Sequence, residues 1–246
     1  MRESKPAIVG ILGGMGPAAG ANFVQLFVQA CDAFLKERGE LVIDQAFPEH
    51  WLAQLPVPDR TNALIDGAPS PLPGLLAGLR QLKSLGARAV AIPCNTAHAW
   101  YEPLQHSCPE VELLHIVEQT VSKLRMDRVE AVGLMATIGT HKTNLYESEL
   151  QRAGIHCHAP THEEQLLVMN GICDGVKAGN LGLARMHFEK VAQLLVERHG
   201  LSTLVLACTE IPLALRTLPR HPGVRLIDPS EVLAKALAER AYTQPR

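Results

Sequence analysis

An internal repeat of strand and helix patterns limits the folds that are open to this chain. The segment Val9–Gly16 lines up with Val132–Gly139, and each half later places a cysteine, Cys94 or Cys208, directly after an apolar run. In both halves short β-branched runs alternate with helical stretches, which is typical of a parallel sheet covered by helices. The repeat therefore predicts an α/β fold of two pseudo-symmetric lobes. Each lobe is a short, mostly parallel sheet flanked by helices, and the matched motifs face each other across a cleft.

Hydrophobic periodicity places the individual elements. Apolar runs predict strands at residues 7–12, 41–44, 87–93, 113–116, 129–136, 201–207 and 224–228, and a polar edge strand is expected at 156–158. Apolar residues at helical spacing predict helices from the first glycine turn up to residue 38, at 72–85, 138–151, 163–178 and 181–199, and a last helix through residue 240. Gly39, Gly86 and Gly179 are the expected stops, because glycine readily ends a helix.

Composition and charge exclude several classes of function. The 246 residues carry 23 Lys and Arg against 25 Asp and Glu, and only 2 Trp, 3 Tyr and 5 Phe. Nucleic-acid binding needs a basic face and stacking platforms, and a membrane helix needs about 18 apolar residues in a row, so neither partner is expected. The N-terminus lacks the features of a signal peptide. The six scattered cysteines are expected to be free thiols in a reducing, cytoplasmic environment.

The two cysteines at matched strand ends carry the chemistry. Open α/β sheets bind ligands at the carboxyl ends of their strands, where Cys94 and Cys208 stand. A thiol there is expected to feel the positive end of the following helix, which lowers its pKa and favours the thiolate. One such cysteine suggests a nucleophile, whereas a facing pair suits stereoinversion at an acidic carbon, because one thiolate removes a proton and the opposite thiol returns one. We therefore predict these two cysteines as catalytic residues in the cleft.

Polar residues around the strand ends are candidates for substrate binding. With backbone N–H groups, their side chains can hold a carboxylate on which charge develops. They are Asn95, Thr96, Thr137, Thr140 and Thr209. Candidate pocket walls are Met15, Gln45 and Phe47. Because a thiol pair performs both proton transfers itself, no metal and no cofactor is expected.

Several motifs resemble those of the cofactor-independent aspartate/glutamate racemase family, and most of all its aspartate racemase branch. These motifs are Gly13–Pro17, Val57–Thr61, Cys94–His98, Leu134–Thr140 with Tyr146, and Cys208–Leu213. The resemblance runs from about residue 8 to residue 235. It implies racemisation of aspartate, or of glutamate or a broader set of amino acids, by two-base proton transfer at the α-carbon without pyridoxal phosphate.

The resemblance also implies an organisation and further binding residues. The C-terminal helix is expected to return to the first lobe, so that residues 1–117 with 228–246 form one lobe and residues 118–227 form the other. Arg60 and Lys177 look like the pair that grips the side-chain carboxylate of the substrate. A homodimer is the expected assembly.

Other interpretations rest on weaker signals. The turn Gly14–Ala19 fits a dinucleotide-binding pattern, but the acidic residue expected about 20 residues further on is missing. His156, His158 and His162 suggest a metal, but the second histidine of a zincin helix is absent. Another cysteine-dependent enzyme of the superfamily, such as a hydantoin racemase or a maleate isomerase, remains an alternative. So does a non-catalytic protein that binds an acidic amino acid and keeps its affinity when both cysteines are replaced by serine.

Overall fold

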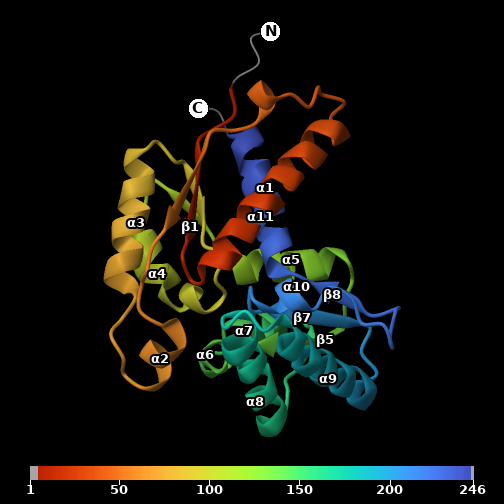
Figure 1. The fold of residues 1–246 in the computed structure, drawn as a ribbon. Coiled ribbons are helices and arrows are strands. Elements are labelled where there is room, and N and C mark those ends of the chain that lie inside the picture. Colours follow the sequence, from red (N-terminus) through yellow and green to blue (C-terminus); the bar gives the residue numbers. More distant parts are fainter. Residues whose placement is uncertain (1–4, 245–246) are drawn as a thin grey trace.

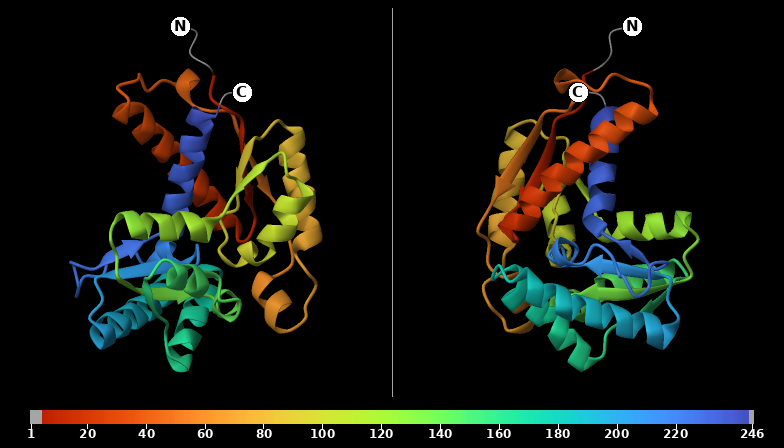
Figure 2. Two further views of the ribbon diagram at one scale, coloured as in Figure 1. Left: turned by 180° about the vertical axis from the view of Figure 1, so that it is seen from behind. Right: turned by 45° about the vertical axis from the view of Figure 1, so that its right-hand side comes forward.

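The computed structural model describes residues 5–244, which form two four-stranded sheets. The strands are β1 Val9–Gly13, β2 His50–Gln54, β3 Ala89–Ala91, β4 Glu112–Leu114, β5 Ala131–Ala136, β6 His156–His158, β7 Thr203–Ala207 and β8 Arg225–Ile227. The first sheet has the order β2-β1-β3-β4 and the second β6-β5-β7-β8, with all neighbouring strands parallel. Figures 1 and 2 show the two sheets in separate lobes, each flanked by helices. Since matching strands take matching places, the predicted two-lobed α/β fold is confirmed.

The two sheets also share their register. Gly10 lies opposite Val90, and Gly133 lies opposite Leu204. In both lobes the candidate cysteine lies four residues after the strand residue that faces this glycine (94 − 90 and 208 − 204). A Cβ on Gly10 would lie 2.9 Å from Cγ2 of Val90, and one on Gly133 would lie 2.5 Å from Cδ2 of Leu204, so neither position has room for a side chain. The sequence repeat is thus a structural repeat that brings both cysteines to equivalent strand ends.

Helices cover both faces of the first sheet. The helices of the first lobe are α1 Pro17–Glu37, α2 Arg60–Ile65, α3 Leu72–Ser84, α4 Tyr101–Ser107 and α11 Pro229–Thr243, with short 3₁₀ turns at Asp44–Ala46 and Thr96–Trp100. Side chains alternate along β1, so Val9 and Ile11 pack with the residues of α1 and α11, whereas Leu12 packs with those of α3. This alternation places α1 and α11 on one face and α3 on the other.

The second sheet is covered in the same way. Its helices are α5 Ile116–Met126, α6 Ile138–Lys142, α7 Leu145–Arg152, α8 His162–Asn170, the π-helix Gly171–Val176, α9 Leu181–His199 and α10 Ile211–Ala214. A capping box starts α8, in which the Thr161 side chain accepts from the backbone N–H of Glu164 and the Glu164 side chain accepts from that of Thr161. Gly200 ends α9 in a left-handed conformation.

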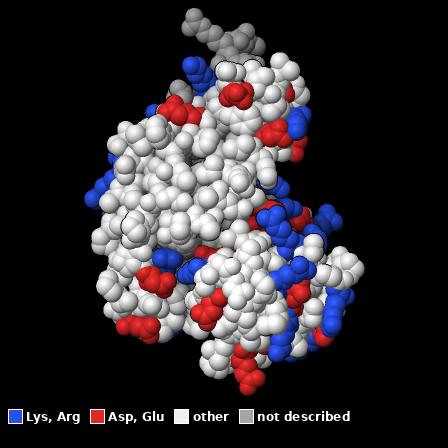
Figure 3. All heavy atoms as spheres, viewed as in Figure 1, with Lys and Arg blue, Asp and Glu red and all other residues white. Residues whose placement is uncertain are grey.

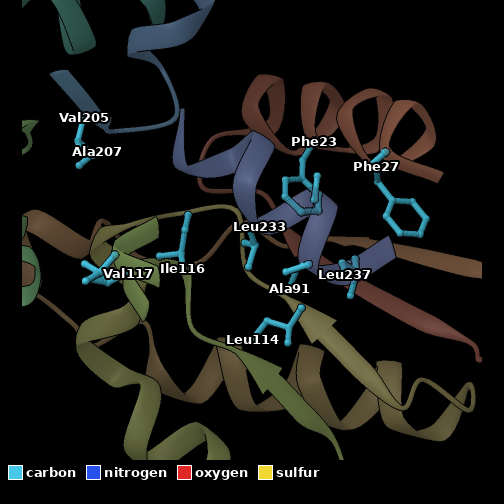
Figure 4. Packing of buried hydrophobic residues seen from close by; sticks show 14 of the residues in the cluster. Phe23, Phe27, Ala91, Leu114, Ile116, Val117, Val205, Ala207, Leu233 and Leu237 are labelled. Atoms are coloured by element: carbon cyan, nitrogen blue, oxygen red, sulfur yellow. The ribbon is translucent and has the colours of Figure 1, made fainter. Parts of the chain in front are cut away.

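One hydrophobic core joins the two lobes. Figure 4 shows Phe23 and Phe27 of α1 above α11, which carries Leu233. The same cluster continues through Ile116 to Val205 of β7. Both phenylalanines are fully buried, and burial of each contributes about 1.5–3 kcal/mol to folding. α11 therefore contacts α1 and α5, although it follows a strand of the second sheet.

The lobe boundaries at residues 117/118 and 227/228 stay a prediction. The predicted first lobe includes residues 1–4 and 245–246, which lie outside the described part of the chain. Most of the N-terminal segment that was considered for a signal peptide lies outside it too. Within residues 5–244 no helix is long and apolar enough to cross a membrane.

The predicted strand at residues 41–44 is wrong. Leu41 is 79% exposed and this segment pairs with no strand of residues 5–244, whereas β2, nine residues later (50 − 41), pairs with β1. The reason is geometric. α1 has 21 residues and is about 31 Å long, far longer than the five-residue β1, so residues 38–49 are needed to return to the start of β1 (Figure 1).

Two predicted helices are interrupted. The one expected at 138–151 is split into α6 and α7, because Asn144 takes a left-handed φ of 51°. The one expected at 163–178 is α8 followed by the π-helix, a rare form that often accompanies functional sites. Hydrophobic spacing signals neither interruption. The polar edge strand expected at 156–158 is confirmed as β6.

Candidate active site

The carboxyl ends of the central strands of both sheets meet at one narrow cavity between the lobes, with a volume of about 30 Å³. Side chains from both lobes line it. Figure 3 shows a hollow between the lobes with positive and negative side chains close together beside it. The cavity therefore has the position at which open α/β sheets bind their ligands.

The structure brings most of the predicted site residues to this cavity. Nine of the ten line it, namely Met15, Arg60, Cys94, Asn95, Thr96, Thr137, Lys177, Cys208 and Thr209. The tenth, Thr140, is fully buried behind the lining, with its hydroxyl 2.9 Å from that of Thr96. Gln45 and Phe47 do not line the cavity, and Phe47 packs against the shared core instead.

Cys94 lies in the turn after β3 and is only 6% exposed. Its backbone N–H donates to the carbonyl of Ile92 at 2.8 Å, which holds the turn. Burial raises the pKa of the thiol, the Arg60 guanidinium lowers it again in part, and the charge of Glu210 adds to the rise. Arg60 is thus the group that favours the thiolate of Cys94.

Cys208 follows β7 and is equally buried. Its Sγ donates to Oε2 of Glu210 at 3.1 Å, and the same carboxylate oxygen accepts from Oγ1 of Thr209 at 3.1 Å. Burial, followed by the charge and hydrogen bond of Glu210, raises the pKa of this thiol well above its ordinary value, and Cys94 adds to the rise. Cys94 therefore lies close enough to affect the ionisation of Cys208.

The expectation that helix dipoles lower both thiol pKa values is wrong. After Cys94 comes a 3₁₀ turn of five residues, and after Cys208 comes α10 with four. Such short segments carry little macrodipole, while the loss of solvent around a thiol with 6% exposure penalises its charged form. Burial outweighs the dipole at both positions.

Arg60 is held by backbone carbonyls rather than by a carboxylate. It is the first residue of α2, after the N-cap Asp59. Its Nη1 donates to the carbonyl of Pro58 and its Nη2 to that of Met15, each at 3.1 Å. The Nε–H is buried without a hydrogen-bond partner among residues 5–244. The guanidinium therefore acts on Cys94 through its charge and hydrogen bonding, and its buried Nε–H faces no acceptor among the described residues.

Lys177 stands at the mouth of the cavity. It follows the π-helix, and its Nζ lies 3.9 Å from Oδ2 of Asp59 in the opposite lobe. Both side chains are more than a third exposed, so this contact is weak. The lysine is free to turn toward an anion in the cavity.

Hydroxyl and amide groups of the two lobes form hydrogen bonds with one another near the thiols. The hydroxyls of Thr96, Thr137 and Thr140 form a triangle with sides of 2.9, 2.9 and 3.0 Å. The Tyr146 hydroxyl donates to Oδ1 of Asn95 at 2.6 Å, and Nδ2 of Asn95 is buried without a partner in the described chain. The cavity therefore presents donors to a ligand oxygen.

Sequence reasoning assigned no role to four lining residues, which are Asp59, Thr61, Ile172 and Glu210. Glu210 is the most informative of them, because it contacts Cys208 and also accepts from the backbone N–H of Gly16, in the other lobe, at 3.3 Å. Its position two residues after a candidate catalytic cysteine was the available signal. A surface glutamate is the usual interpretation of such a residue, and only the fold shows that this one is 5% exposed.

Two lobes of one topology, each contributing a buried cysteine to a shared cavity, define a two-lobed α/β protein with two thiols at one cavity. Comparison with known proteins identifies the family. The Asp/Glu/Hydantoin racemase model matches residues 12–237, and the chain belongs to this family, whose aspartate and glutamate racemases are isomerases.

Relatives and solved structures agree with this membership. The broad specificity amino-acid racemase RacX of Bacillus subtilis (strain 168) is 26% identical over 232 residues, which cover 93% of this chain and 96% of that protein. A glutamate racemase of Shewanella woodyi is 28% identical over 184 residues, 73% of this chain and 63% of that protein. The structure of Picrophilus torridus aspartate racemase has a TM-score of 0.80 and 29% identity, and the match covers 98% of this chain and 96% of that chain.

Proposed function

We propose that the chain is a pyridoxal-phosphate-independent amino-acid racemase that acts on aspartate, with Cys94 and Cys208 as opposed base and acid. The observation that carries the proposal is the pair of buried thiols at matched strand ends of the two lobes, at one cavity. Family membership supports racemisation, and the likeness to an aspartate racemase supports an acidic substrate.

The surroundings of the two thiols differ, although burial raises the pKa of both. Arg60 favours the thiolate of Cys94, whereas Glu210 accepts a hydrogen bond from Cys208 and favours its thiol. The Cys94 thiolate removes the proton from the α-carbon, and the electron pair of that C–H bond moves onto the α-carboxylate. The Cys208 thiol delivers its proton to the opposite face, which leaves a Cys208 thiolate, a Cys94 thiol and the mirror-image amino acid. The reverse reaction exchanges the two roles.

Two unpartnered donors support a dicarboxylic substrate. Nε of Arg60 and Nδ2 of Asn95 are buried in the lining, and neither has a hydrogen-bond partner within residues 5–244. A buried N–H without a partner costs about 1–3 kcal/mol, so ligand oxygens that accept from these groups are favoured. Lys177 adds a third positive or polar donor at the mouth. This donor set suits the two carboxylates of aspartate.

The size of the cavity supports a motion of the lobes. A volume of about 30 Å³ holds about two water molecules, each of which needs ~10–15 Å³, and is too small for an amino acid. We therefore propose that the lobes part to admit the substrate and close over it. Closure excludes water and strengthens the electrostatic interactions around the developing carbanion.

Proton NMR in D₂O tests the proposal, with single enantiomers of aspartate, glutamate and several neutral amino acids and no added cofactor. Loss of the α-proton signal with growth of the opposite enantiomer is expected. Cys94→Ala and Cys208→Ala should each abolish it, whereas Cys108→Ala, at a buried cysteine outside the cavity lining, should not. If no amino acid exchanges its α-proton while one still binds, the chain is a binding protein and the proposal fails.

We further propose that two copies associate through the open edge of the first sheet. β2 is an edge strand, and Trp51 and Leu52 on it are 41% and 39% exposed. The face of the first lobe seen in Figure 3 carries few charged side chains. An apolar, unpaired edge favours association. Trp51→Glu should shift sedimentation from dimer to monomer, and the control Leu166→Glu, on an exposed helix position of the other lobe, should not. A wild-type monomer would contradict this assembly.

A cytoplasmic location is part of the same proposal. All six cysteines are free thiols, and free thiols persist in reducing compartments. Cell fractionation should recover the chain with cytoplasmic proteins, and recovery in the periplasm or the membrane fraction would contradict this location.

A further inference from the structure

Tyr146 makes a hydrogen bond between the lobes that the proton-transfer scheme does not use. It lies in α7 and is fully buried in the core that the lobes share. Its hydroxyl donates to Oδ1 of Asn95, on the turn after β3, at 2.6 Å. Burial raises the pKa of the phenol well above its ordinary value, so the hydroxyl keeps its proton. The second lobe therefore supplies a protonated hydroxyl that donates to an amide of the first.

This donor determines what Asn95 offers to a ligand. A carboxamide has one accepting oxygen and one donating NH₂ group. Because the oxygen accepts from Tyr146, the amide is held in the orientation that leaves Nδ2 as the group without a partner among the described residues. The amide lines the cavity. Asn95 is thereby fixed as a donor, the form that binds a carboxylate, and is kept from turning its oxygen toward the ligand.

The next residue of the same turn is held in the same way. The hydroxyl of Thr96 lies 2.9 Å from the hydroxyls of both Thr137 and Thr140, which belong to the second lobe. No side-chain cap anchors this turn at its start within the first lobe, since Asn95 makes no capping hydrogen bond. Two adjacent ligand-facing residues of one lobe thus take their orientation from the other lobe.

We propose that Tyr146 is a positioning residue that orients the Asn95 amide to donate to a substrate carboxylate, so that this binding group is complete only when the lobes are together. The inference rests on the proposed function, because it takes the cavity as the place of the amino acid's carboxylate. It adds a specific role for the second lobe in substrate binding, separate from its catalytic cysteine.

The double-mutant cycle of Tyr146→Phe and Asn95→Ala tests the inference, with aspartate binding measured by titration calorimetry and racemisation measured separately. Tyr146→Phe keeps the ring and removes the hydroxyl, so a loss of about tenfold in affinity is expected, the size of one hydrogen bond to a charged group. In the Asn95→Ala background the same substitution should have no further effect. Tyr242→Phe is the matched control, because it removes a phenol hydroxyl that donates to the carbonyl of Ala46, and it should leave affinity unchanged.

The outcomes separate this inference from the proposed function. If aspartate binds, the cycle shows coupling and no racemisation occurs, the inference stands and the proposed activity fails. If racemisation occurs but Tyr146→Phe weakens binding equally with and without Asn95, the tyrosine acts only through general packing and the inference is overturned. Absence of aspartate binding to the wild-type chain overturns it as well. Circular dichroism and thermal unfolding of each variant confirm that the fold is retained in the comparison.

Discussion

Gly139 lies where the lobes meet beside the cavity, and Gly139→Ala tests whether the spacing of the lobes controls catalysis. A Cβ at this position would lie 3.0 Å from Oγ1 of Thr61, 3.1 Å from Cα of Thr61 and 3.2 Å from Cγ2 of Thr96. Both threonines belong to the first lobe, whereas Gly139 belongs to α6 of the second. One of the atoms in the way is backbone, so a side-chain rotation cannot relieve the contact. The lobes must separate by a few tenths of an ångström.

The effect on stability should be small and the effect on catalysis large. Alanine is favoured over glycine in a helix by about 1 kcal/mol, and overpacking costs about 1–3 kcal/mol. The free energy of unfolding should therefore change by a net loss of about 0–2 kcal/mol. A displacement of about 1 Å between reacting groups costs roughly 100-fold in rate, so a shift of about 0.3–0.5 Å should lower kcat/KM about four- to tenfold.

Urea unfolding and the NMR racemisation assay measure the two quantities. Gly182→Ala is the matched control, because it is also a helical glycine and its added Cβ would be 3.8 Å from the nearest atom, Oδ1 of Asn180. That variant should gain up to about 1 kcal/mol and keep wild-type kinetics. A Gly139→Ala protein with unchanged kcat/KM would refute the argument that lobe spacing limits the reaction.

Two further predictions concern ionisation. Glu210→Gln removes a negative charge and should lower the pKa of the Cys208 thiol, so alkylation of Cys208 by iodoacetamide, followed by mass spectrometry at pH 8, should be faster than in the wild type; an unchanged rate would show that the carboxylate does not hold the thiol. His98 and His115 have pKa values lowered to about 3 and about 4, in both cases chiefly by burial. Below about pH 6.5, the ordinary pKa of histidine, only the unfolded chain binds these two protons. As the pH falls further, the free energy of unfolding should decrease by about 1.4 kcal/mol per pH unit for each histidine, until the pH reaches the pKa of that histidine in the folded chain. His98→Gln should remove part of this acid sensitivity in urea titrations, and an unaltered slope would contradict it.

Much of the fold follows from local patterns. The central strands and the helices at 72–84 and 181–199 were predictable because apolar spacing reports which face of an element is buried. The prediction of a strand at 41–44 was wrong because the apolar run Leu41–Ile43 carries the same signal as a strand. Which segment pairs with β1 depends instead on where the chain returns to the sheet after α1. Spacing also cannot reveal the left-handed Asn144 or the π-helix, which depend on packing against other elements.

The candidate site, too, was predictable from the sequence only in part. The matched cysteines and their polar neighbours could be found from the sequence, because two similar strand ends in two similar lobes must lie at equivalent places. The partners of these residues could not. Glu210 reaches Cys208 locally but reaches Gly16 across 194 positions of chain, and Tyr146 meets Asn95 across 51. Such contacts depend on how the lobes pack against each other.

Periodicity and residue types at short spacing were enough to predict the two-lobed α/β architecture and the pair of cysteines at matched strand ends. The ionisation of those thiols depends instead on how the elements pack. Burial raises both pKa values, and Arg60 and Glu210 then act on Cys94 and Cys208 in opposite senses. Solvent exclusion and the distances between charges are properties of packed elements. No local pattern encodes them, which is why the expectation of lowered thiol pKa values was wrong.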